Sequence, residues 1–155
     1  MTKLFLSLHV LAAVLAIGPV TVAASMFPRA LRHAHSAPGD IEVLAGLRTL
    51  HRICRVYAGI GIAVPLFGFA TAGTLGVLGS GWLITSIILT AAAAAVLGLL
   101  ILPVQESALT AAQAPDPGPG VPPAARLAML TGLFNLLWAT VTVLMIVRPG
   151  STTGA

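Results

Sequence analysis

A single histidine lies in a long uncharged stretch near the start of the chain. In the segment LSLHVLAAVLAIGPV, residues 6–20, His9 is the one ionisable side chain, and no charged residue occurs between Lys3 and Arg29. At about 100° per residue, a helix through this segment places His9 on the side of its small residues, opposite the bulky aliphatic ones. Small side chains mark helix–helix contacts within membranes, so we expect His9 to point into a helical bundle.

Two kinds of role are open to His9. As a neutral hydrogen-bonding residue it would orient neighbouring helices. As a functional group it would relay protons or ligate a metal ion or a haem iron, because an ionisable side chain inside a membrane often belongs to a functional site. We favour the structural role, since His9 is shallow and has no ionisable neighbour at its depth.

Other polar residues fall at a similar depth on the later apolar segments. His9 lies about 9 Å along its helix from Lys3, at 1.5 Å per residue, and the later residues are at similar distances from the ends of their segments or one to two turns deeper. The small and polar residues on their helix faces predict that they point inward. The predicted interior polar layer consists of His9, Thr85, Ser86, Asn135 and Thr142.

The remaining histidines could form a metal site with nearby carboxylates. Histidines two residues apart point the same way only in an extended segment, so this hypothesis requires the HAH sequence to lie in a loop. The candidate ligands are His33, His35 and His51, with Asp40 and Glu42 beside them. Cys54 is the only cysteine, so no disulfide can form within the chain.

Three arginines share one face of a predicted helix. Asp40 can cap a helix that begins at about Ile41 and continues into the next apolar segment. Arg48, Arg52 and Arg55 then lie at positions i, i+4 and i+7 of that helix. This stripe is expected to be solvated among anionic lipid head groups, and a binding site for an anionic ligand is the alternative.

The composition of the chain decides which elements position these residues. The chain has 155 residues, is 57% hydrophobic and 8% charged, and has a mean hydropathy of +1.01, whereas soluble domains carry about 25% charged residues. No charged residue occurs from Val56 to Gln105. A membrane-spanning helix needs roughly 20 apolar residues. We therefore predict an all-α membrane protein of one domain, an antiparallel bundle of four helices at about 4–27, 53–74, 82–103 and 126–147.

The distribution of lysine and arginine predicts the orientation. Six of these residues fall in the predicted loops 28–52 and 104–125 or at their edges, and two lie near the other ends of the spans. The positive-inside rule places both loops in the cytoplasm and both termini outside. The topology accounts for the basic charge, so no nucleic-acid partner is implied. Residues 105–125 contain five prolines and predict a flexible linker.

Three segments resemble known bacterial membrane proteins. LSLHVLAAVLAIGPVTVAASMFPRALR, LHRICRVYAGIGIAVPLFGFATAG and LFNLLWATVTVLMIVRPGS resemble a family of small bacterial four-span membrane proteins with no established activity. More distantly, LHVLAAV followed by FPRALRHAH is similar to the first span of J-type protoporphyrinogen oxidases and CopD copper-resistance proteins. That similarity implies a haem b or metal ligand at His9, although no second intramembrane histidine is present.

Two functions from different classes follow. The first is a non-enzymatic membrane bundle that acts as a scaffold, an accessory subunit or a small-solute component in a bacterial inner membrane, with lipids as its partners and an oligomer or protein partner left open. The second is a redox or metal-handling membrane protein that uses His9 as a haem or metal ligand.

Overall fold

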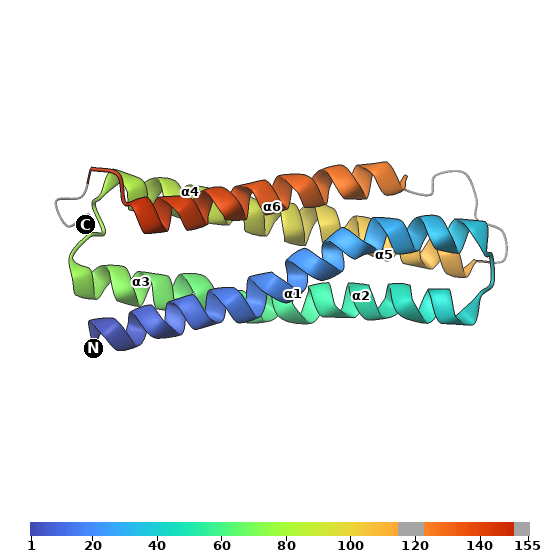
Figure 1. Cartoon of the computed structure of the whole chain (residues 1–155), viewed down its shortest axis with the longest axis horizontal. Coiled ribbons are helices and arrows are strands. Elements are labelled where there is room, and N and C mark those ends of the chain that lie inside the picture. Colours follow the sequence, from blue (N-terminus) through green and yellow to red (C-terminus); the bar gives the residue numbers. More distant parts are fainter. Residues whose placement is uncertain (115–122, 151–155) are drawn as a thin grey trace.

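The described part of the chain forms four long helical segments. A computed structural model describes residues 1–114 and 123–150, and all secondary structure in these residues is helical (Figure 1). This confirms the predicted all-α class and the four apolar segments long enough to cross a membrane. The elements are α1 (Thr2–Ser36), α2 (Ile41–Ile60), α3 (Ala63–Leu75), α4 (Gly81–Ala95), the π-helical turn η1 (Val96–Ile101), α5 (Leu102–Gln113) and α6 (Ala124–Val147).

The helices are longer than the predicted spans. α1 has 35 residues and is about 52 Å long, whereas the hydrocarbon core of a bilayer is about 30 Å thick. The predicted helix from about Ile41 into the second span is confirmed by α2. The prediction of a loop before it is wrong over residues 28–36, because α1 continues to Ser36. The side chain of Asp40 accepts hydrogen bonds from the backbone N–H groups of Glu42 and Val43, which confirms the predicted cap.

The predicted linker is also partly helical. Residues 105–113 belong to α5, so the prediction of a flexible segment is wrong there, and residues 115–122 lie outside the described part of the chain. Pro103 follows directly after the π turn η1 within one continuous helical segment, Gly81–Gln113, so this proline does not end the segment. The helix ends at Gln113 instead, immediately before the proline-rich sequence.

Two local irregularities interrupt the second and third segments. Between α2 and α3 the helix tightens at Gly61, because Pro65 cannot donate to the Gly61 carbonyl. The N–H of Val64 bonds that carbonyl instead, at 3.1 Å. In the third segment, η1 contains a bond from the N–H of Leu102 to the carbonyl of Leu97, five residues earlier, which defines a π turn.

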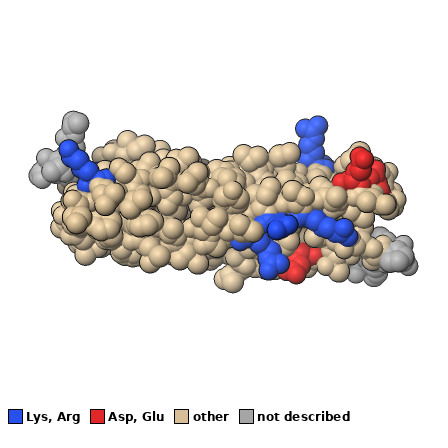
Figure 2. Space-filling view, turned by 90° about the horizontal axis from the view of Figure 1, so that it is seen from below, with Lys and Arg blue, Asp and Glu red and all other residues tan. Residues whose placement is uncertain are grey.

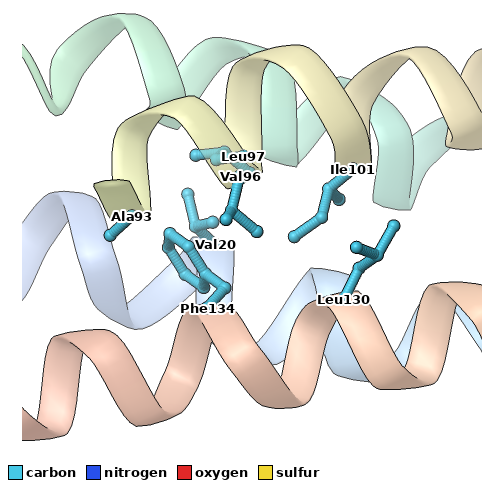
Figure 3. Packing of buried hydrophobic residues seen from close by; sticks show 7 residues of the cluster. All are labelled: Val20, Ala93, Val96, Leu97, Ile101, Leu130 and Phe134. Atoms are coloured by element: carbon cyan, nitrogen blue, oxygen red, sulfur yellow. The ribbon is translucent and has the colours of Figure 1, made fainter. Parts of the chain in front are cut away.

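Apolar side chains fill the centre of the bundle. Val20 of α1 and Phe134 of α6 meet side chains of α4 and η1, and all of them point toward one another (Figure 3). Phe134 is 1% exposed and also packs edge-to-face with Trp138, with ring centroids 6.3 Å apart. The members of this central core are Val20, Ala93, Val96, Leu97, Ile101, Leu130 and Phe134.

A second apolar core lies where the helices extend beyond the central core. It is formed by α1, α2, α5 and the start of α6, which meet at the end of the molecule that holds the turn between α1 and α2 (Figure 1). Leu31, Leu47 and Ala108 are completely buried in it. We call this end of the bundle the cap, and its core consists of Phe27, Leu31, Ala34, Leu47, Ala108, Ala124 and Leu127.

The surface divides into a charged cap, an uncharged belt and a narrow opposite end. On the face shown in Figure 2, acidic residues and most of the basic ones gather toward the cap, and a long uncharged surface separates them from a basic residue at the other end. At that end the guanidinium of Arg148 lies 5.7 Å from the ring centroid of Trp82, an arrangement typical of a membrane interface. The chain is therefore a multi-pass membrane protein.

Candidate functional site

His9 faces the bundle, but its partner is not the predicted one. Its Nδ1 lies 2.8 Å from the carbonyl oxygen of Val64, and since a carbonyl only accepts, Nδ1 donates. A Cβ atom added at Gly68 would lie 3.0 Å from the His9 Cε1 and 3.2 Å from its Nδ1. The ring therefore occupies the space that a glycine of α3 leaves open. The predicted layer of His9 with Thr85, Ser86 and Thr142 is wrong, because α1 pairs with α3 in this half and His9 bonds a backbone carbonyl there.

The predicted polar layer is not assembled. The hydroxyls of Thr85 and Thr142 are exposed, and each donates to the carbonyl four residues earlier in its own helix, at 2.9 Å. Ser86 is fully buried, yet its hydroxyl also bonds within α4, to Trp82. Hydroxyls in apolar surroundings satisfy themselves on the nearest backbone carbonyl, so these residues need no common partner.

Asn135 lies at the contact between α6 and α1. Its Nδ2 donates to the hydroxyl of Ser25 over 3.3 Å, whereas its buried Oδ1 has no partner. One turn away, the Thr131 hydroxyl donates to the carbonyl of Ala24 at 3.4 Å. That carbonyl is the one that Pro28 deprives of its helical donor, so α6 supplies the missing bond.

The small-residue face of α6 points mostly outward. We expected it to face the bundle, and this is wrong apart from Thr131, which is 3% exposed, and Asn135, which contacts α1. Bulky residues such as Phe134 and Leu130 fill the interior on this helix instead. The small-residue members that are exposed are Ala128, Gly132, Ala139 and Thr142.

A buried polar cluster lies at the border between the belt and the cap. His51 of α2 is 7% exposed, and its Nδ1 lies 3.2 Å from Oε1 of Gln105 on α5. The Nε2 of Gln105 lies 3.7 Å from the sulfur of Cys54, and both of these residues are completely buried. The Nε2 of His51 is buried without a partner. We call these three residues the His51 cluster.

Two of the three predicted arginines lie beside this cluster. Arg52 and Arg55 are exposed, and with His51 and Val56 they line an open recess of about 470 Å³. Arg48 is placed differently, because its guanidinium donates to Oε1 of Gln113 at 3.1 Å, across the cap. The stripe is thus divided between a structural contact and a basic recess.

The predicted metal ligands do not come together. His33 and His35 lie two residues apart on α1, where successive side chains diverge, and both are exposed. Asp40 is engaged as a helix cap, and His51 belongs to the buried cluster. Among the described residues, no group of three or more histidine, cysteine, aspartate or glutamate side chains is arranged to hold a metal ion.

Gln105 was missed in the sequence. It ends the long uncharged run, and we assigned it to the border of a linker. Two facts would have indicated its role: an amide at a membrane border is a strong hydrogen-bonding group, and Gln105 lies four residues after the buried Ile101 and three before the buried Ala108, on one helical face.

Comparison with protein-family models, with curated proteins and with solved structures finds no match to this chain. The fold and the geometry of its buried polar residues therefore carry the functional argument.

Proposed function

We propose that this chain is a non-enzymatic protein of a bacterial cytoplasmic membrane, which acts as a scaffold or accessory component. The observation that supports this role most strongly is the central core. Val20, Leu97 and Phe134 come from three different segments and meet in the middle of the belt (Figure 3). Close-packed apolar side chains at this depth oppose passage of a polar solute between the helices.

The positions of the two inward-facing histidines support the same role. The His9 ring bonds Val64, which lies 13 residues after His51 along the α2–α3 segment, or about 20 Å away. Haem ligation by two histidines requires both nitrogens within about 2 Å of the iron. A haem shared by His9 and His51 does not fit this arrangement, so the resemblance to haem-binding oxidases does not extend to a bis-histidine site.

The orientation is part of the proposal. Five of the arginines, Arg29, Arg32, Arg48, Arg52 and Arg55, lie on the cap half of α1 and α2, and Arg126 lies at the start of α6. By the positive-inside rule the cap faces the cytoplasm, and the turn between α3 and α4 faces outward together with both termini.

The test is complementation of a deletion strain. A scaffold needs its shape and its amount in the membrane, so His9→Gln, which keeps a polar group next to Val64, should complement any growth or envelope phenotype as well as the natural sequence. His9→Leu should complement only in proportion to the folded protein that remains. Folded amount is measured in parallel by fluorescence-detected gel filtration of the detergent extract.

Two results would contradict the proposal. One is loss of complementation by His9→Gln at an unchanged folded amount, which would make the proton or lone pair of the imidazole the functional group. The other is a Soret absorption band corresponding to one haem per purified chain that disappears in His9→Ala.

A further inference from the structure

The recess beside the His51 cluster lies at the depth of the lipid head groups. From Arg55 to Gly76, at the outer turn, there are 21 residues, or about 32 Å of helix, close to the thickness of bilayer hydrocarbon. Arg126 and Arg148 of α6 bracket a similar length. His51 and Arg52 lie about one turn beyond Arg55, so the recess that they line opens into the head-group layer.

The hydrogen bond to Gln105 decides what His51 offers to a ligand. An amide oxygen only accepts, so the Nδ1 of His51 carries the hydrogen that it donates to Oε1. In the structure the Nε2 of Gln105 lies 3.7 Å from the Cys54 sulfur, and Oε1 is the amide atom next to His51. In a neutral ring, Nε2 is then a lone-pair acceptor, and it is buried without a donor. A buried acceptor with no partner is unfavourable, so a ligand that supplies a donor here gains from it.

The recess is thus lined by two cationic donors and by His51, whose Nε2 is a buried acceptor. The guanidinium groups of Arg52 and Arg55 suit the oxygens of a phosphate, which accept hydrogen bonds in pairs. Nε2 of His51 suits a hydroxyl. An ammonium group could also donate to Nε2, but it would stand next to two positive charges. The geometry points to an anionic phosphodiester whose head group carries a hydroxyl.

We propose that this recess binds a phospholipid of the phosphatidylglycerol type. The phosphate would accept hydrogen bonds from Arg52 and Arg55, and a glycerol hydroxyl would donate to Nε2 of His51. A lipid is favoured over a soluble glycerol phosphate because the recess continues into apolar surface. Val56 lines it, and Ile60 follows one turn closer to the bilayer centre, and both are about half exposed, which provides a path for an acyl chain.

The experiment compares lipids that differ by one group at a time. The purified full chain in mixed micelles is titrated with dioctanoyl phosphatidylglycerol, phosphatidylmethanol and phosphatidylethanolamine, and with soluble glycerol phosphate, and bound ligand is counted by native mass spectrometry. Phosphatidylmethanol has the same charge as phosphatidylglycerol and lacks the hydroxyls. The two lipids differ by one hydrogen bond, from the glycerol hydroxyl to Nε2 of His51. Phosphatidylglycerol should therefore bind about fivefold more tightly than phosphatidylmethanol. Phosphatidylethanolamine and glycerol phosphate should bind more weakly than either.

Variants assign the two parts of the site. His51→Leu should remove the preference for phosphatidylglycerol over phosphatidylmethanol and leave the binding of phosphatidylmethanol unchanged. The double substitution Arg52→Ala and Arg55→Ala should weaken both anionic lipids by the same factor. Arg48→Ala is the matched control, because that guanidinium is bonded to Gln113 outside the recess, and it should leave the preference intact.

Three outcomes would overturn the proposal: equal binding of phosphatidylglycerol and phosphatidylmethanol by the natural sequence, unchanged lipid binding in the double arginine variant, or glycerol phosphate binding as tightly as the lipid. The comparison of phosphatidylglycerol with phosphatidylmethanol uses the natural sequence, so it tests the proposal even if His51→Leu does not fold. None of these measurements depends on which side of the membrane the cap faces or on the scaffold role.

Discussion

At the scale of single residues, buried polar groups in this protein are satisfied by neighbours that the helical pattern alone does not identify. Pro28 lies inside α1 and cannot donate to the carbonyl of Ala24, and the hydroxyl of Thr131 on α6 donates to it instead. The small residues around His9 correctly predicted that this side chain faces the bundle. They could not predict Val64 as its partner, because periodicity tells which face of a helix is buried and not which helix covers it.

Removal of the Thr131 hydroxyl should destabilise the protein only while Pro28 is present. Thr131→Val keeps the shape of the side chain and should lower the free energy of unfolding by about 0.6 kcal/mol, the average for hydrogen bonds between membrane helices. In a Pro28→Ala background the restored N–H at position 28 bonds Ala24, so the same substitution should have almost no effect. A double-mutant cycle, measured by unfolding in mixed micelles, gives the difference. Equal losses in both backgrounds would show that the 3.4 Å contact carries no energy.

At the scale of elements, the sequence located the four apolar segments and the start of α2, and it missed how far the first and third helical segments continue. Charged residues mark where the hydrocarbon ends, and they do not mark where a helix ends. Arg29 and Arg32 both lie within α1, which continues to Ser36. The same reasoning missed residues 105–113, because Pro103 in the first turn of α5 does not interrupt the segment. Asp40 was predicted correctly, since a helix cap is local chemistry. The π turn has no comparable sequence mark, and it helps to bring Gln105 to the face of α5 that meets His51.

A π turn holds one residue more than an α turn, which makes a deletion there unusual. Deletion of Leu99, which is 73% exposed within η1, should convert the π turn into an α turn and leave the flanking faces close to their present directions. Deletion of Ile88, which is 62% exposed in the regular helix α4, should rotate one side of the segment by about 100° against the bundle. The thermal stability of the purified variants in detergent should therefore fall much less for Leu99 than for Ile88. The reverse order, or equal losses, would show that η1 does not absorb the extra residue.

At the scale of the whole molecule, two apolar cores stabilise one continuous bundle in two different solvents. The central core lies in the belt, where lipid tails compete with side chains for apolar contact. The cap core around Leu31 and Leu47 lies beyond the basic border, where water surrounds the helices and the hydrophobic effect drives packing. The fold class could be predicted because it follows from the length of the uncharged runs. The packing of α1, α2 and α5 into a cap could not be predicted, although the start of α2 was, because the mixed composition of these segments occurs equally in loops.

Cysteine labelling tests the orientation. In a Cys54→Ser background, Leu78→Cys places a thiol on the turn between α3 and α4, where the residue is 53% exposed, and Ala114→Cys places one at the exposed end of α5. An impermeant maleimide added to intact cells, with the outer membrane permeabilised, should label position 78 and reach position 114 only after lysis. Labelling of position 114 in intact cells would reverse the proposed topology.

The length of the cap helices sets how far the turn between α1 and α2 stands from the hydrocarbon of the membrane. From Arg55 to Ile41 there are 14 residues, so the turn at residues 37–40 stands about 21 Å above the border of the hydrocarbon, beyond the head groups. Side chains of α1, α2 and α5 pack together just below that level, so this turn stands on packed helices. A cytoplasmic protein that bound this turn would not touch lipid. Binding of such a protein and occupancy of the lipid recess would then be two independent events on one membrane protein.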